Sequence, residues 1–161
     1  MSYFVRRYLL VVSTVMAVGA LLHVAAIAVG ARGYVLLGAP AGLVALVGTG
    51  SLRPAVSCLV IASLLLLGSV YGFSGAGLGP RLPACRPVLG IIAAVLVVRG
   101  IFLPVVAAWR PYLLRGLCGH CQAVNGFVLF TSVLCLIVGV GYALGAFRAA
   151  PNYALKRTCA E

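Results

Sequence analysis

Four long apolar stretches dominate the sequence, and each is long enough to cross a bilayer as a helix. They comprise residues 8–30, 54–72, 88–108 and 127–147. About 20 apolar residues in a helix span a hydrocarbon core of roughly 30 Å. None of the four stretches shows the sustained apolar–polar alternation of a barrel strand, so helices are expected. The sequence therefore predicts an all-α, polytopic membrane protein with four transmembrane helices in one bundle.

The composition agrees with a membrane protein. Of 161 residues, 64% are hydrophobic and only 8% are charged, whereas a soluble domain has about 25% charged residues. So few charged residues cannot cover a water-facing surface. The length allows one transmembrane domain over residues 1–147, and we expect the polar segment 148–161 to be a flexible tail.

The charge is strongly one-sided, with 12 Lys and Arg residues against a single acid, Glu161. The basic residues are scattered singly and form no patch with interleaved aromatics, so we expect no nucleic-acid partner. Attraction to an anionic membrane face is the better explanation. Because no predicted span contains a carboxylate, carboxylate-driven cation transport is disfavoured. A homo-oligomeric channel or carrier is disfavoured for the same reason.

The distribution of Lys and Arg predicts the orientation. An even number of helices places both termini on one side, and the positive-inside rule assigns the more basic side to the cytoplasm. We therefore predict a multi-pass protein of a bacterial inner membrane with both termini cytoplasmic. The basic residues on the side of the termini are Arg6, Arg7, Arg81, Arg86, Arg148, Lys156 and Arg157, against Arg32, Arg53, Arg110 and Arg115 on the other.

The first span has some features of a secretory signal. Arg6 and Arg7 precede it, and Ala26-Ile27-Ala28 has the form of a cleavage site. Its apolar run exceeds the usual core of about 7–15 residues in a signal peptide, so we favour a retained membrane helix.

Residues 36–51 are apolar but too short to cross the membrane. They form either an interfacial or re-entrant helix beginning near Pro40 or a loop packed on the bundle. Elsewhere, two glycine pairs at spacing four, Gly68 with Gly72 and Gly141 with Gly145, would allow close helix packing. They are equally explained by the high frequency of glycine in membrane helices.

Arg99 lies near the middle of the third span, where a charge costs roughly 2.5 to 3.5 kcal/mol. Pro104 follows, which frees the carbonyl of Gly100 and favours a kink. His23 in the first span lies within about 6 Å of the same depth. We expect a polar cluster that includes Arg99, His23, Ser63, Thr131 and Ser132, with Cys135 at a similar depth.

Two interpretations of the Arg99 cluster are open. In the structural one, Arg99 snorkels or bonds carbonyls and hydroxyls and holds the bundle together. In the functional one, its guanidinium binds an anionic small molecule, a lipid or a partner helix, because this chain supplies no acid in its spans. The functional hypothesis makes the protein a non-enzymatic binding protein that needs no cofactor.

Cys118-Gly119-His120-Cys121 is the most specific local motif. The resemblance to thioredoxin-like proteins is limited to this Cys-x-x-Cys pattern, but four-helix membrane oxidases are similar in helix count and in carrying a loop dithiol. Such oxidases use a second external cysteine pair, which this sequence lacks. A thiol–disulfide oxidoreductase using Cys118 and Cys121 is the alternative function, and a local disulfide or plain loop cysteines explain the motif better than redox catalysis does. The two cysteines and His120 are too few for a closed zinc site, so no metal is expected.

One family resemblance covers roughly residues 8–147. It rests on several short segments, best on the Ser-Gly-Ala-Gly turn with its Leu-Pro and on the Arg-Gly pair of the third span. Together these segments resemble an uncharacterised family of small four-helix inner-membrane proteins of Gram-negative bacteria. The resemblance implies the same architecture and location and no particular activity. Its segments are Leu22-His23, Tyr34, Gly38-Ala39, Tyr71 to Gly77, Leu82-Pro83 and Arg99-Gly100.

Overall fold

The computed structural model describes residues 3–80, 82–114 and 126–148, and these are helical with no strand among them. Four helices are long and apolar enough to cross a membrane: α1 (Tyr3–Val29), α4 (Arg53–Gly75), α5 (Cys85–Trp109) and α6 (Gly126–Arg148). They pack together, which confirms the predicted all-α four-helix bundle of a multi-pass membrane protein. Helices suit a bilayer because each backbone amide finds its carbonyl within the same segment.

The observed spans begin and end close to the predicted positions. Each is somewhat longer, because the helices continue through the flanking arginines and short polar residues. Prolines mark two starts: Pro54 is the second residue of α4 and Pro87 the third of α5. Proline fits the first helical turn, where its missing N–H has no partner to lose. The third span, α5, continues through Pro104 to Trp109.

The connection between α1 and α4 contains short helices. Gly30, at φ +74°, ends α1, and α2 (Ala31–Leu36) folds back against it. The approach is tight, since a Cβ on Gly33 would lie 2.8 Å from the Cα and carbonyl oxygen of Ala26. Helix α3 (Ala41–Ala45) follows Pro40 and continues as the 3₁₀ turn η1 (Leu46–Thr49). A short helix near Pro40 is thus confirmed, whereas α2 was not predicted.

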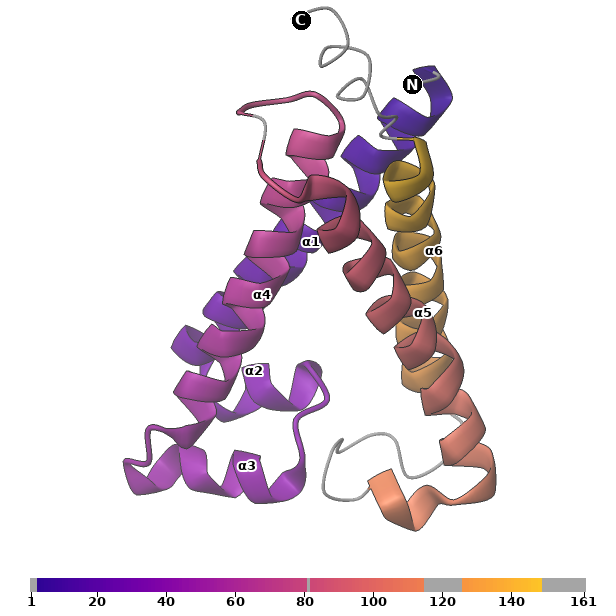
Figure 1. The fold of residues 1–161 in the computed structure, drawn as a ribbon. Coiled ribbons are helices and arrows are strands. Elements are labelled where there is room, and N and C mark those ends of the chain that lie inside the picture. The colour runs from indigo at the N-terminus through magenta and orange to yellow at the C-terminus, as the bar shows by residue number, and fades with distance from the viewer. Residues whose placement is uncertain (1–2, 81, 115–125, 149–161) are drawn as a thin grey trace, which may run out of the picture.

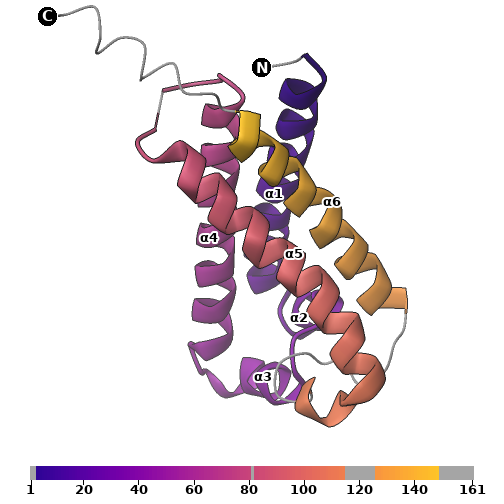
Figure 2. The same ribbon diagram turned by 45° about the vertical axis from the view of Figure 1, so that its right-hand side comes forward.

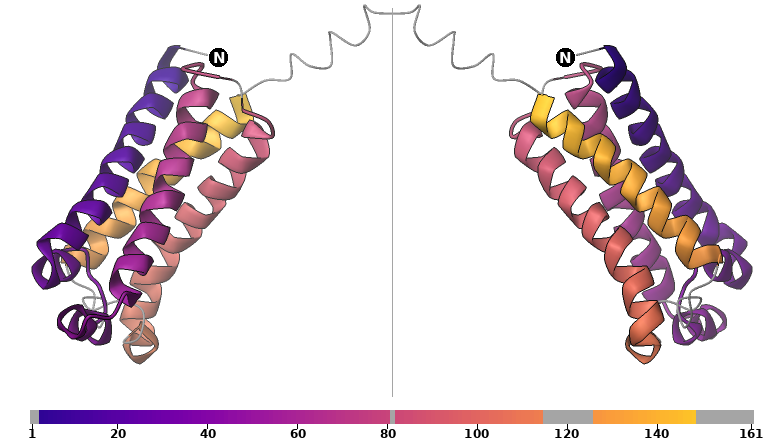
Figure 3. Two further views of the ribbon diagram at one scale, coloured as in Figure 1. Left: turned by 90° about the vertical axis from the view of Figure 1, so that its left-hand side faces the viewer. Right: turned by 90° about the vertical axis from the view of Figure 1, so that its right-hand side faces the viewer.

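The four spanning helices form two pairs. Helix α1 packs mainly on α4, and α5 mainly on α6, with fewer contacts between the pairs. The pairs meet at the end where α1 begins and α6 ends, and they separate toward the other end, as Figure 1 shows. Helices α2 and α3 lie at the end where α4 begins (Figure 2). The 3₁₀ turn η2 (Pro111–Leu114) lies at that same end (Figure 3).

The contacts that join the two pairs explain this shape. The Tyr142 hydroxyl of α6 donates a hydrogen bond to the carbonyl of Gly68 on α4 at 3.0 Å. The Tyr8 hydroxyl of α1 donates to the carbonyl of Ile137 on α6 at 2.8 Å. Leu9 is fully buried against Gly145. At the separated end, the ring of Phe127 lies against Gly38, just after α2. The main apolar core therefore sits at the joined end of the bundle.

Both predicted glycine pairs lie at helix contacts. A Cβ on Gly68 would lie 2.9 Å from the Met16 methyl, and Gly72 faces the hydroxyls of Ser13 and Tyr142. Gly141 and Gly145 lie against side chains of α1. The close-packing interpretation of these glycines is therefore confirmed.

The turn after α4 is held by side-chain hydrogen bonds. The Ser74 hydroxyl donates to the carbonyl of Pro80 at 2.9 Å and accepts from the amide of Leu82 at 3.1 Å. Arg6 donates from Nε to the carbonyl of Ala76 at 3.0 Å, where a cation complements the negative end of α4. This segment is an ordered turn that ties α1 to the end of α4.

Candidate intramembrane binding site

Gly68 marks the layer at which all four spanning helices meet. A Cβ on it would lie 2.9 Å from the Met16 methyl of α1 and 3.7 Å from Cδ1 of Ile92 on α5, and the hydroxyl of Tyr142 on α6 donates to its carbonyl. Tyr142 is fully buried. This layer gives a reference for placing residues farther along each helix.

The next layer toward the separated end contains the two residues that the sequence singled out. Side chains seven positions apart share a face of an α-helix, about 10 Å along its axis. Seven residues after Met16 is His23, and seven after Ile92 is Arg99. Helices α4 and α6 run the other way, so their counterparts are Ile61 and Cys135. His23 and Arg99 thus lie at one depth, on helix faces that point inward at the Gly68 layer.

Exposure rises between the two layers. Met16 and Tyr142 are buried, whereas His23 and Cys135 are half-buried, Arg99 is exposed, and Ile61 is 43% exposed. This change follows from the separation of the helix pairs toward that end (Figure 1). The described protein atoms therefore cover the side chains of this layer less than those of the Gly68 layer.

Arg99 is without a hydrogen bond or ion pair to any residue that the structure describes. In one version of the structural interpretation, Arg99 bonds carbonyls or hydroxyls of the bundle. Among the described residues there is no such hydrogen bond. A guanidinium has five N–H donors and no acceptor. In hydrocarbon these donors need acceptors from elsewhere, and an anionic acceptor satisfies the charge as well.

His23 has a defined hydrogen-bonding role. Its Nδ1 lies 2.8 Å from the carbonyl oxygen of Gly19, one turn earlier. A carbonyl only accepts, so Nδ1 carries the proton and donates it, and in the neutral ring Nε2 is an acceptor. The side chain can therefore receive one hydrogen bond in this layer.

The other predicted residues are placed in three ways. Thr131 is half-buried on the Tyr142 face of α6, one turn beyond the layer, and its hydroxyl donates to Phe127 at 2.9 Å. Ser132 is buried beside Gly100, and its hydroxyl has no hydrogen-bond partner among the described residues. Ser63 is not brought to the layer: it lines a separate groove between α1 and α4 and bonds the carbonyl of Leu59.

The predicted redox pair, Cys118 and Cys121, lies outside the described residues, as does the tail over residues 149–161. Three other cysteines are free: Cys58, Cys85 and Cys135. Cys85 is the first residue of α5 and its thiol donates to the carbonyl of Tyr71 at 3.6 Å. Within the described residues there is no group of His, Cys, Asp or Glu side chains that could hold a metal ion.

The described site therefore consists of one unpaired cation and one histidine acceptor in this less covered intramembrane layer, with Thr131 close by on α6. Such a set can bind an acidic group, and it offers no carboxylate or activated nucleophile for catalysis. Comparison with known protein families, curated proteins and solved structures finds no match to this chain.

Proposed function

We propose that this protein is a non-enzymatic binding protein of the bacterial inner membrane that holds an acidic group at Arg99, between its two helix pairs. The observation that carries the proposal is the exposed guanidinium of Arg99, which pairs with no described residue although it lies in the middle of an apolar helix. The counter-charge must come from outside the spans, because the chain's one acid is Glu161.

The acidic group can belong to a small anion, a lipid or a side chain of a partner helix, and all three present the same chemistry to Arg99. Arginine suits a carboxylate or phosphate because its planar donors bind two oxygens at once. His23 adds an acceptor for a protonated oxygen of the same group. The orientation with both termini cytoplasmic, and membership in the small four-helix family of Gram-negative bacteria, belong to this proposal as well.

A photo-cross-linker in the same layer tests the proposal in cells. Benzoylphenylalanine replaces Ile61, and the masses of the cross-linked products are compared between the protein with Arg99 and the Arg99→Gln and Arg99→Lys variants. The control position is Val60, whose side chain points about 100° away around α4. We expect an adduct to an acid-bearing molecule from position 61 that persists with lysine and disappears with glutamine. The mass of the adduct distinguishes a lipid, a small anion and a protein.

Two outcomes would contradict the proposal. One is a set of products from position 61 that is unchanged by Arg99→Gln. The other is a product spectrum from position 61 that consists of neutral bilayer lipids and equals that from position 60. Either result would leave Arg99 as a residue that the bilayer itself accommodates.

A further inference from the structure

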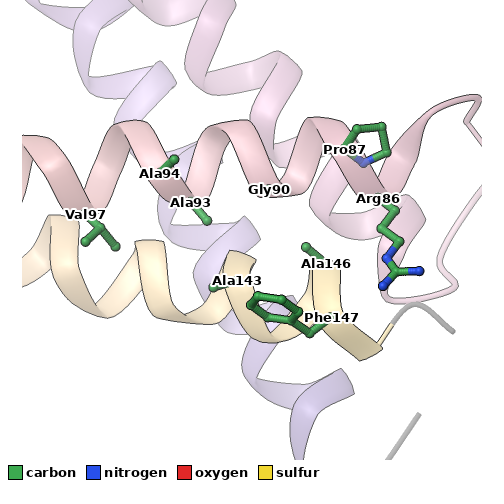
Figure 4. A pocket seen from close by; sticks show the side chains of 9 residues that line it. All are labelled: Arg86, Pro87, Gly90, Ala93, Ala94, Val97, Ala143, Ala146 and Phe147. Carbon is green, nitrogen blue, oxygen red and sulfur yellow. The ribbon is translucent and has the colours of Figure 1, made fainter.

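A groove of about 560 Å³ lies between α5 and α6, on the side of α5 opposite Arg99. Figure 4 shows its lining, which is mostly small side chains: Gly90, Ala93, Ala94 and Val97 from α5, with Ala143 and Ala146 from α6. A Cβ added to Gly90 would meet nothing within 4 Å, so the space beside this glycine is open. The groove is apolar because both helices are apolar along this length.

The length of the groove matches one leaflet. Its lining on α5 runs from Arg86 to Val97, which is about 16 Å along the helix. Half of a bilayer's hydrocarbon core is about 15 Å thick. An extended acyl chain that enters beside the first turn of α5 would therefore lie along the groove to its end.

A cation lies at the end of the groove where α5 begins. Arg86 is the second residue of α5, is exposed, and forms no hydrogen bond or ion pair with a described residue. Figure 4 shows its side chain extending beside Ala146 and Phe147. The first turn of α5 has no acidic residue and no side-chain cap, so its positive end adds to the charge of Arg86.

We propose that this groove holds an anionic phospholipid of the leaflet at which α5 begins, with an acyl chain against the small residues and the phosphate on Arg86. An acyl chain gains little by leaving bulk lipid for this groove, since both are apolar. The preference among lipids therefore rests on the headgroup. One basic side chain at an anionic membrane surface is worth about a fivefold preference.

Native mass spectrometry of protein released from nanodiscs tests this assignment. The nanodiscs contain equal amounts of phosphatidylglycerol and phosphatidylcholine with identical acyl chains. We expect phosphatidylglycerol to be retained about fivefold over phosphatidylcholine, Arg86→Gln to equalise the two, and Arg7→Gln, a charge removal at the same end of the bundle, to change nothing. All of these variants are compared on an Arg99→Gln background, so that a lipid held at Arg99 does not contribute and the groove is tested separately from the proposed function.

A second variant tests the groove itself. Gly90→Leu places a side chain in the open space and should lower retention of both lipids. Gly42→Leu is the matched control, since a Cβ there also meets nothing within 4 Å and the residue lies in α3. Equal retention of both lipids by Arg99→Gln alone, or unchanged retention in Gly90→Leu, overturns the proposal. A dimer that Gly90→Leu dissociates also overturns it, because a second copy would then fill the groove.

Discussion

The hydroxyl of Tyr142 on α6 donates a 3.0 Å hydrogen bond to the carbonyl of Gly68 on α4, and this bond joins the two helix pairs toward the end at which they meet. Tyr142 is fully buried, and the hydroxyl of Ser13 from α1 lies against the neighbouring Gly72. Three helices thus place polar groups within one small region of an otherwise apolar core.

Replacing Tyr142 by phenylalanine removes this hydrogen bond and keeps the ring. Hydrogen bonds between membrane helices average about 0.6 kcal/mol, with a maximum near 1.7 kcal/mol. We expect Tyr142→Phe to lower the free energy of unfolding by about 1 kcal/mol, measured by denaturation in mixed micelles. Tyr8→Phe removes the exposed hydrogen bond to the carbonyl of Ile137 and should lower the free energy of unfolding by less. An equal or larger cost for Tyr8→Phe would contradict the larger contribution that we assign to the buried hydrogen bond of Tyr142.

Among the glycines that the structure describes, Gly72 has the least room for a side chain. A methyl group there would overlap the hydroxyl of Ser13 and lie 2.9 Å from that of Tyr142. We expect Gly72→Ala to destabilise the bundle by about 1–3 kcal/mol through overpacking. Gly90→Ala, in open space on α5, should be neutral or stabilising by about 0.5 kcal/mol, because alanine is the better helix former. Thermal unfolding of the two variants in one detergent measures the difference, and a harmless Gly72→Ala would refute this packing.

The proposed orientation is testable with single cysteines in a background without the six native ones. Gly42→Cys reports on α3, and Leu78→Cys, at an exposed position, reports on the turn between α4 and α5. Because we propose that the termini are cytoplasmic, a membrane-impermeant thiol reagent should label position 42 in intact cells and spare position 78. The reverse pattern would invert the topology. Native Cys85 is a poor reporter because it is half-buried with its thiol bonded to Tyr71.

The bundle was predictable because membrane spans are encoded locally. Twenty consecutive apolar residues need a bilayer whatever their neighbours are, so the four spans follow from hydropathy alone. The break at Gly30 was missed, since the apolar run continues unbroken across it. Only the left-handed backbone at Gly30 and the close contact of Gly33 with Ala26 reveal why α2 turns back.

The candidate site was predictable in part. Depth along each helix can be counted from the sequence, and this count assigned His23 and Arg99 a similar depth. The face of each helix depends on tertiary packing, which counting does not supply. Ser63 was therefore grouped with the cluster although it faces another groove, and the burial of Ser132 beside Gly100 needed the α5–α6 contact.

The separation of the two helix pairs also could not be read from hydropathy. It arises because the inter-pair contacts of Tyr8, Leu9 and Tyr142 all lie toward one end of the bundle. The exposure of Arg99 is a consequence of this uneven distribution of contacts between the helix pairs.

The most direct test of the central claim is the thermal stability of the purified protein in a neutral detergent with and without oleate, a carboxylate on an apolar chain. A ligand at a hundred times its Kd stabilises by about 2.7 kcal/mol. Arg86→Gln is present in every sample, so that the groove between α5 and α6 does not hold the carboxylate. We expect oleate to raise the unfolding temperature of Arg86→Gln and of Arg86→Gln with Arg99→Lys, and to leave that of Arg86→Gln with Arg99→Gln unchanged. An equal rise with Arg99→Gln would show that the anion does not bind at Arg99 and would contradict the account.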